Sequence, residues 1–98
     1  MNFKLRFTDS AITDYDRLKK NSSYAKRFKA IRKALGYLET NPKHPGLNTH
    51  KYQSIKGPNG EEVFEAYAEN NTPAAYRIFW CYGPNKKEIT IIAITPHP

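Results

Sequence analysis

A small group of side chains in this sequence has the chemical types needed to cleave RNA without a metal ion. That reaction needs a group that takes the proton of a ribose 2′-hydroxyl, cations that stabilise the charge on the phosphate oxygens, and an acid that protonates the leaving 5′-oxygen. Residues of these types, besides exposed tyrosines, are Arg77, His97, His50 and Lys51. Whether these side chains lie close together depends on the helices and strands that carry them.

Arg77 lies in the middle of residues 75–82, the strongest strand pattern in the chain. Alternation assigns to the core face Tyr76, Ile78, Trp80 and Tyr82. Arg77 then lies on the opposite face of the sheet. A cation at such a position either binds an anion such as phosphate or pairs with an acidic side chain of the adjoining strand, for which Glu65 and Glu69 are the candidates.

Two histidines are candidate site residues, and the sequence indicates a position in the fold for each. His97 follows Thr95-Pro96, directly after a predicted last strand over residues 87–95. Histidine is the natural general acid or base near neutral pH, although a residue near a chain end can also have no role. His50 can reach the uncovered face of the sheet beside Lys51.

The charge of the chain is concentrated in its first half. The 98 residues carry a net charge of +7, and residues 1–56 hold 13 basic and 4 acidic side chains, whereas residues 57–98 hold 3 and 5. A basic surface attracts phosphate backbones, and the alternative is a solvated helix face that only keeps the protein soluble. The candidate RNA-binding side chains are Lys26, Lys29, Lys33, His50, Lys51 and Lys56.

Several classes of function are disfavoured by the sequence. The single cysteine, Cys81, cannot form an internal disulfide or a cysteine-based metal site, and we expect no metal and no cofactor. There is no glycine-rich phosphate loop, no carboxylate cluster spaced for a metal and no Gly-x-Ser-x-Gly elbow. No apolar stretch is long enough for a membrane span or a signal peptide, so we expect a cytoplasmic protein.

The order of the predicted elements indicates an α+β fold. A strand over residues 2–7 is followed by a helix that begins after Thr8-Asp9-Ser10 and places Ala11, Ile12, Tyr15 and Leu18 on one face. A second helix over residues 24–40 has its apolar residues at alternating steps of four and three. The remaining strands are predicted over residues 48–55, 62–69, 75–82 and 87–95. We therefore expect one domain over residues 1–98, in which an antiparallel helical hairpin covers one face of a mostly antiparallel sheet of four to five strands and leaves the other face partly open.

Three stretches of the sequence resemble one known family. They are Ile55-Lys56-Gly57 with Glu62-Val63-Phe64-Glu65, Tyr76-Arg77-Ile78-Phe79-Trp80, and Ile91-Ile92-Ala93-Ile94-Thr95-Pro96-His97. Together with the order of the elements, they resemble the RelE/ParE superfamily of bacterial type II toxins over nearly the whole chain. The resemblance implies a small toxin that is neutralised by an antitoxin protein. RelE-like members cleave mRNA in the ribosomal A site, whereas ParE-like members poison DNA gyrase.

The resemblance also assigns roles to individual residues. Arg77 matches the arginine that RelE-like nucleases use on the scissile phosphate, and His97 resembles the histidine that some branches use as the general acid. At the positions of two lysines on the middle strand of RelE, this chain has Glu65 and Tyr67, and Glu65 could serve as a base. The basic helix could dock on ribosomal RNA. The leading hypothesis is a ribosome-dependent endoribonuclease, and the alternatives are a gyrase poison without catalytic activity and a non-toxic relative that binds an antitoxin or RNA.

Overall fold

The computed structural model describes residues 2–69 and 74–96. Its elements are β1 (Lys4–Phe7), α1 (Asp9–Lys20), the short 3₁₀ turn η1 (Ser22–Tyr24), α2 (Ala25–Thr40), a second 3₁₀ turn η2 (Pro45–Leu47), β2 (His50–Lys56), β3 (Glu62–Tyr67), β4 (Tyr76–Tyr82) and β5 (Glu88–Pro96). The expected helices and strands are thus present at nearly the expected bounds, and the α+β class is confirmed.

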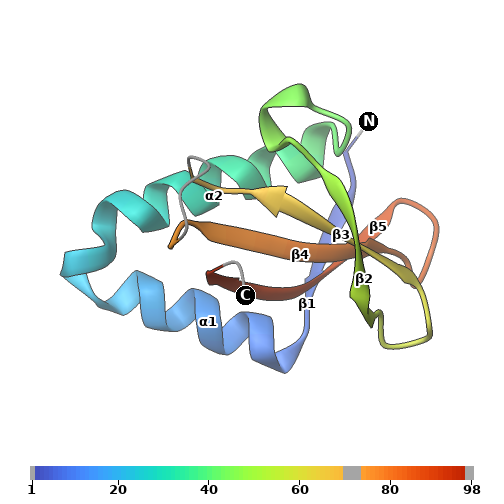
Figure 1. Ribbon diagram of the computed structural model, residues 1–98, viewed down its shortest axis with the longest axis horizontal. Helices are drawn as coiled ribbons and strands as arrows, with labels where there is room; N and C mark the ends of the chain where they lie inside the picture. The colour runs from blue at the N-terminus through green and yellow to red at the C-terminus, as the bar shows by residue number, and fades with distance from the viewer. Residues whose placement is uncertain (1, 70–73, 97–98) are drawn as a thin grey trace.

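The five strands form one mixed sheet in the order β1-β5-β4-β3-β2. β1 runs parallel to β5, and the other neighbouring strands are antiparallel. The strand that carries Arg77, β4, therefore lies at the centre of the sheet, between β3 and β5 (Figure 1). β3, β4 and β5 follow one another along the chain and each pairs antiparallel with the next, so this part of the sheet is a meander.

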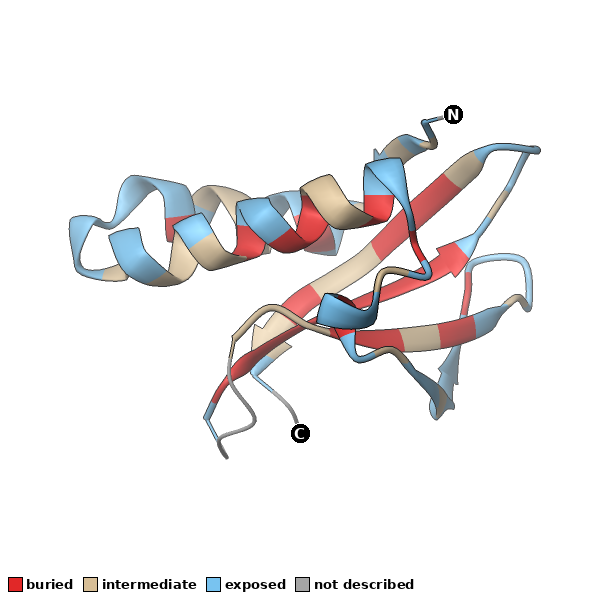
Figure 2. Ribbon diagram, turned by 90° about the horizontal axis from the view of Figure 1, so that it is seen from above, coloured by how far each residue is buried: buried red, intermediate tan, exposed pale blue. Residues whose placement is uncertain are grey.

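The helices α1 and α2 form a layer on one face of the sheet (Figure 2). The hydroxyl of Thr8 accepts a hydrogen bond from the backbone N–H of Ala11 and caps α1, so that of the three candidates Thr8, Asp9 and Ser10 the first is the cap and the helix already begins at Asp9. The core between the layers includes Leu18, Ile31, Leu38, Ile78, Trp80, Ile91 and Ile94. The prediction that Ile12 faces this core is wrong, because Ala11 takes the inward position and Ile12, one residue further round the helix, is 47% exposed.

The opposite face of the sheet is more covered than the sequence pattern indicates. Every residue of β4 from Tyr76 to Cys81 is buried, on both faces. The cause is a large irregularity in β2: Lys51 pairs with Phe64 and Lys56 with Glu62, so β2 uses more residues than β3 over the same stretch. The extra residues bend β2 across the sheet, as its course over β3 and β4 in Figure 1 shows.

None of the described helices is long and apolar enough to cross a membrane.

Candidate functional site

Arg77, Glu65 and Tyr67 meet on the face of the sheet opposite the helices. Tyr67 is the cross-strand partner of Arg77, and Glu65 points to the same face two residues earlier on β3. The guanidinium carbon of Arg77 lies 3.9 Å from the centroid of the Tyr67 ring. Its Nε lies 3.9 Å from Oε2 of Glu65, and Nη1 donates a long hydrogen bond of 3.4 Å to the carbonyl oxygen of Tyr76.

Both charged groups of this cluster are buried, since Arg77 is 3% exposed and Glu65 is 6% exposed. Arginine stays protonated in proteins, so a buried guanidinium needs an anion and polar contacts around it. Glu65 supplies the charge and Tyr67 an aromatic face. The Nε of Arg77 nevertheless has no hydrogen-bond partner among the described residues. A buried donor without a partner is uncommon and marks a place where an anionic ligand would be stabilised.

The structure decides between the two sequence interpretations of Arg77. It pairs with Glu65, as one of them predicts, and it does not stand free on an open face. The other acidic candidate, Glu69, has a different role: its Oε1 accepts hydrogen bonds from Nε of Arg27 and from the backbone N–H of Tyr76. Glu69 therefore ties α2 to the start of β4 and takes no part in the cluster around Arg77.

The cluster extends to β2 through an aromatic contact. The ring of His50 lies 5.8 Å from the ring of Tyr67, and His50 is the cross-strand partner of Glu65. The prediction that His50 reaches this face of the sheet is confirmed, and its imidazole is exposed to solvent. Lys51 does not join it, because its Nζ lies 3.5 Å from the carboxylate of Glu62.

The candidate RNA-binding lysines do not form one surface around the cluster. Lys26 and Lys33 line a groove of about 530 Å³ between α2 and the end of β3. The other residues along this groove are Ala30, Ala34, Tyr37, Gly46, Tyr67, Ala68 and Glu69. Tyr67 is the one residue that the groove shares with the cluster around Arg77, since neither Arg77 nor Glu65 lines the groove. Lys29 on α2 and Lys56 at the end of β2 are exposed outside the groove.

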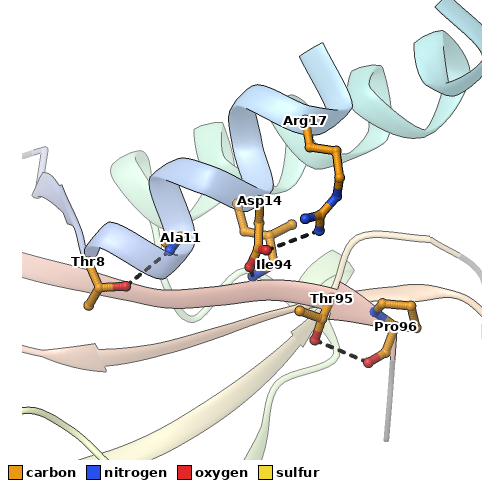
Figure 3. Close-up of polar contacts among 7 residues, drawn as sticks. All are labelled: Thr8, Ala11, Asp14, Arg17, Ile94, Thr95 and Pro96. Atoms are coloured by element: carbon orange, nitrogen blue, oxygen red, sulfur yellow. Dashed lines mark hydrogen bonds and ion pairs between the residues drawn. The ribbon is translucent and has the colours of Figure 1, made fainter. Parts of the chain in front are cut away.

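The end of β5 brings Thr95 next to Arg77, since the two are cross-strand partners. This end extends beyond β1, whose pairing with β5 stops at Phe7 and Ile91. Beyond that point, α1 and its N-terminal capping residue bind the backbone of β5. The hydroxyl of Thr8 donates to the carbonyl oxygen of Ile92. The carboxylate of Asp14 accepts from the N–H of Ile94 (Figure 3). His97, the candidate general acid, lies outside the described residues.

Four groups away from the cluster have a shifted pKa, namely Glu61, Cys81, Tyr82 and Glu88. Burial raises the pKa of the Cys81 thiol to about 11, and the nearby charge of Glu61 acts in the same direction. A hydrogen bond from the backbone N–H of Asn59 lowers the pKa of Glu61. The described residues contain no group of three or more metal-ligating side chains.

Sequence reasoning missed the second hollow on this face, which is lined by residues of β2, β4 and β5, among them Tyr52 and Ile55. These two side chains come from the irregular stretch of β2 between Lys51 and Lys56. A strand that keeps strict alternation would send one of two residues three apart to each face. An irregularity of this size has no reliable signal in one sequence, so the hollow could not have been predicted.

Comparison with known proteins gives matches of structure only. No model of a known protein family matches the chain, and no curated protein matches its sequence. Among solved structures, the YoeB/ParE toxin from Agrobacterium tumefaciens is 15% identical, with a TM-score of 0.71 and coverage of 97% of this chain and 99% of the toxin. The YoeB dimer from Staphylococcus aureus is 17% identical, with a TM-score of 0.67 and full coverage of both chains.

An archaeal relative is similar to the same extent. RelE from the RelE–RelB complex of Pyrococcus horikoshii is 14% identical to this chain, with a TM-score of 0.65, and the match covers 98% of this chain and 96% of the other. At these identities, the likeness concerns the path of the backbone rather than individual side chains. It nevertheless agrees with the family resemblance that the sequence motifs indicate. The chain therefore has the fold of the RelE/ParE toxin superfamily.

Proposed function

We propose that this protein is the toxin of a type II toxin–antitoxin system and that it inhibits translation as a ribosome-dependent mRNA endoribonuclease. The fold supports the toxin class. The observation that carries the nuclease is the buried pair of Arg77 and Glu65 on the face of the sheet opposite the helices. A protein that acts on translating ribosomes works in the cytoplasm.

The proposed reaction uses one group for each of its three requirements. Glu65 takes the proton of the ribose 2′-hydroxyl, and the 2′-oxygen attacks the adjacent phosphorus. Arg77 stabilises the charge that develops on the phosphate oxygens, which requires its side chain to turn toward the solvent, since it is 3% exposed in the structure. The 5′-oxygen leaves with a proton from His97. The products are a 2′,3′-cyclic phosphate and a free 5′-hydroxyl.

Tyr67 acts in this proposal as a positioning residue. Its ring lies over the guanidinium and holds the plane of Arg77 in one orientation. The groove beside Tyr67 supplies positive charge from Lys26 and Lys33, which are suited to bind phosphates of the RNA backbone. His50 stands at the solvent side of Tyr67 and can contact the same strand of RNA.

The proposed protein partner is a cognate antitoxin of acidic character. Its charge would complement the lysines of α2, and an extended segment could add a strand to β2, which is one of the two outer strands of the sheet. Pyrococcus horikoshii RelE was solved in complex with RelB. Co-purification of a small acidic protein encoded beside this gene would test the proposal, and its absence from the purified complex would count against it.

A ParE-like gyrase poison is the second candidate. The burial of Arg77 favours it, because a toxin that only binds its target has no need of an accessible guanidinium. The two candidates make different predictions about the target. A gyrase poison leaves mRNA whole and produces topoisomerase–DNA complexes, whereas the nuclease produces transcripts with new 5′ ends.

The deciding experiment is primer-extension mapping of transcripts after induction of the protein in growing bacteria. We expect cleavage at defined positions within translated codons. Glu65→Gln and Arg77→Lys should each lower cleavage about a hundredfold or more, because each removes a group that acts on the reacting atoms. Arg77→Lys keeps the positive charge beside Glu65 and so favours correct folding.

The matched control is Glu62→Gln, which removes an exposed carboxylate from the same strand and should leave cleavage unchanged. Thermal unfolding of each variant separates loss of chemistry from loss of structure. Intact transcripts together with topoisomerase–DNA complexes would establish the gyrase poison. Normal growth with neither effect would indicate the non-toxic relative.

A further inference from the structure

Three aromatic rings and one lysine meet at the end of the sheet that projects beyond the helices. The ring of Tyr82, the last residue of β4, lies 6.1 Å from the ring of Phe3 and 5.9 Å from the ring of Phe64. The ammonium nitrogen of Lys87 lies 4.7 Å from the centroid of the Phe3 ring. Lys87 belongs to the turn between β4 and β5, which Figure 1 shows at the projecting end. We call these four residues, Phe3, Phe64, Tyr82 and Lys87, the aromatic platform.

The aromatic platform is separate from the cluster around Arg77. The ring of Tyr82 lies 4.9 Å from that of Trp80, which belongs to the core below the helices. Because side chains alternate along a strand, Tyr82 lies on the same face of the sheet as Trp80, and Arg77 lies on the opposite face. Arg77 and Tyr82 also lie near opposite ends of β4. A ligand on the platform therefore contacts neither Arg77 nor its partners.

Tyr82 presents an aromatic ring to solvent in a fixed orientation. It is 40% exposed and is one of the large apolar side chains that the core leaves uncovered. Phe3, Phe64 and Trp80 meet its ring at interplanar angles of 52°, 78° and 79°, so they support it without any of them being stacked parallel to it. Burial raises the pKa of the Tyr82 phenol, which therefore stays neutral and does not repel an anion.

The charge beside these rings is positive. Lys87 forms no ion pair with the carboxylates of the described residues. The acidic side chains at the neighbouring strand ends are already paired, since Glu88 lies 3.3 Å from Arg6 and Glu62 lies 3.5 Å from Lys51. The ammonium group of Lys87 is thus available to an anion from outside the chain.

The backbone of Lys87 is strained, which indicates a use for its side chain. Its φ angle is +63°, in the left-handed region that glycine and asparagine adopt far more readily than lysine. A glycine here would avoid the strain, but it would not place an ammonium group over the ring of Phe3. Residues held in such conformations are concentrated at functional sites.

We propose that the aromatic platform binds one unpaired base of single-stranded RNA. The base stacks on the ring of Tyr82, and its phosphate contacts Lys87. Exposed rings next to cations are a common means of holding unpaired nucleotides, because every base has an aromatic face and every linkage a negative charge. An acidic peptide would supply the negative charge, but most of its residues have no flat ring for Tyr82. The inference goes beyond the proposed function, since it requires neither Arg77 nor cleavage of RNA.

Binding is tested with single-stranded RNA alone. A uridine oligonucleotide of about eight residues, within the size range of single-strand sites, is titrated into the purified protein. Trp80 is the one tryptophan of the sequence and its ring lies 4.9 Å from that of Tyr82, so its fluorescence reports on this site. We expect a saturable change in emission. An RNA duplex of the same length, whose bases are covered by pairing and stacking, is the ligand control and should cause no such change.

Two pairs of variants test the ring and the cation. Tyr82→Leu keeps an apolar side chain but removes the ring, and it should weaken binding about tenfold, whereas Tyr82→Phe should leave the affinity unchanged. Lys87→Gly removes the ammonium group and should retain the fold, because glycine favours this backbone conformation. It should weaken binding and reduce the dependence of binding on salt. The matched control is Lys86→Gly, which removes an exposed lysine from the same turn and should have a smaller effect.

The outcomes separate the platform from the nuclease. Binding that Tyr82→Leu weakens and Tyr82→Phe retains supports the platform even where no transcript is cut. If transcripts are cut but the oligonucleotide leaves the fluorescence of Trp80 unchanged, the platform is overturned and the nuclease stands. Equal effects of the duplex and the single strand, or of Lys86→Gly and Lys87→Gly, would reduce the interaction to attraction by charge and overturn it. Tighter binding of a peptide rich in glutamate and tyrosine than of RNA, lost in Tyr82→Leu, would show a protein-binding surface instead.

Discussion

The guanidinium of Arg77 lies over the ring of Tyr67, 3.9 Å from its centroid, and the two residues are direct cross-strand partners. A carboxylate can neutralise the charge of an arginine from many directions, whereas an aromatic ring stacked below the guanidinium fixes the orientation of its plane. Glu65 thus neutralises the charge of Arg77, and Tyr67 orients its guanidinium.

Replacement of Tyr67 should separate these tasks. In Tyr67→Leu the guanidinium loses its aromatic support, and we expect transcript cleavage to fall roughly tenfold, in line with a cation–π contribution of about 1–2 kcal/mol. Tyr67→Phe keeps the aromatic face and should restore most of the activity. Cleavage is measured by transcript mapping at equal protein levels. A Phe variant as weak as the Leu variant would show instead that the phenolic hydroxyl matters.

Removal of the Arg77 side chain should destabilise the protein as well as inactivate it. Arg77→Ala leaves the carboxylate of Glu65 buried without its cationic partner, which costs on the order of 3 kcal/mol of unfolding free energy. The double variant Glu65→Gln with Arg77→Met removes both charges and should regain more than half of that loss. Urea denaturation gives the unfolding free energy of the native protein, of Arg77→Ala and of the double variant. An Arg77→Ala variant as stable as the native protein would mean that the pair contributes little to the fold.

Asp14 should be needed for an ordered end of β5. Its carboxylate accepts the hydrogen bond of the Ile94 N–H, beyond the point where β1 stops pairing with β5. We expect Asp14→Ala to cost about 1–2 kcal/mol and to speed amide hydrogen exchange at Ile94. Asp16→Ala, which removes the same charge from the same helix, is the control. Unchanged protection of Ile94 in Asp14→Ala would refute the role of this contact.

The groove between α2 and β3 should bind ribosomal or messenger RNA through charge. Lys26→Glu and Lys33→Glu should each weaken binding to purified ribosomes about tenfold at low salt and reduce the dependence of binding on salt. Binding is measured by co-sedimentation. Lys20→Glu makes the same change of charge at an exposed position of α1 and should have a smaller effect. Equal effects of all three would indicate attraction by net charge alone.

The thiol of Cys81 should be inert in the folded protein. It is fully buried, and burial raises its pKa to about 11, so almost none is ionised at pH 8. Iodoacetamide at pH 8 should modify it only after denaturation. Between pH 9 and 11 the unfolded chain releases a proton that the native state keeps, so the native state loses stability as pH rises through this window. Cys81→Ala should show a smaller loss between pH 8.5 and 10.5, and an equal loss would contradict the raised pKa.

The sequence was sufficient for the order of elements because each element has its own local signal. The helices follow from the spacing of Leu18, Ile31 and Leu38, and the central strand follows from the alternation around Trp80. The partner of Arg77 could only be narrowed to Glu65 or Glu69, since alternation places both on the same side of one strand. The structure separates them because Glu69 lies beyond the end of β3, where Arg27 of α2 reaches it.

The shape of the site depends on features that are not local. The hollow at Ile55 results from the bend of β2, which brings side chains of β2 beside strands that are distant in sequence. The three-dimensional structure is also needed to see that Nε of Arg77 has no hydrogen-bond partner among the described residues. Glu65 lies on the adjoining strand, but its carboxylate is slightly too far from this nitrogen for a hydrogen bond. Residue types and spacing therefore predicted which groups gather, but not how accessible each of them is.

The first and last described strands, β1 and β5, are neighbours in the sheet. During synthesis the helical hairpin and the β3–β4 pair can form from residues that have already left the ribosome, but β4 keeps an unpaired edge until β5 has emerged. Completion of the sheet, and with it the setting of Thr95 beside Arg77, must wait for nearly the whole described chain. The proposed site around Arg77 is therefore incomplete for as long as β5 has not paired with β4.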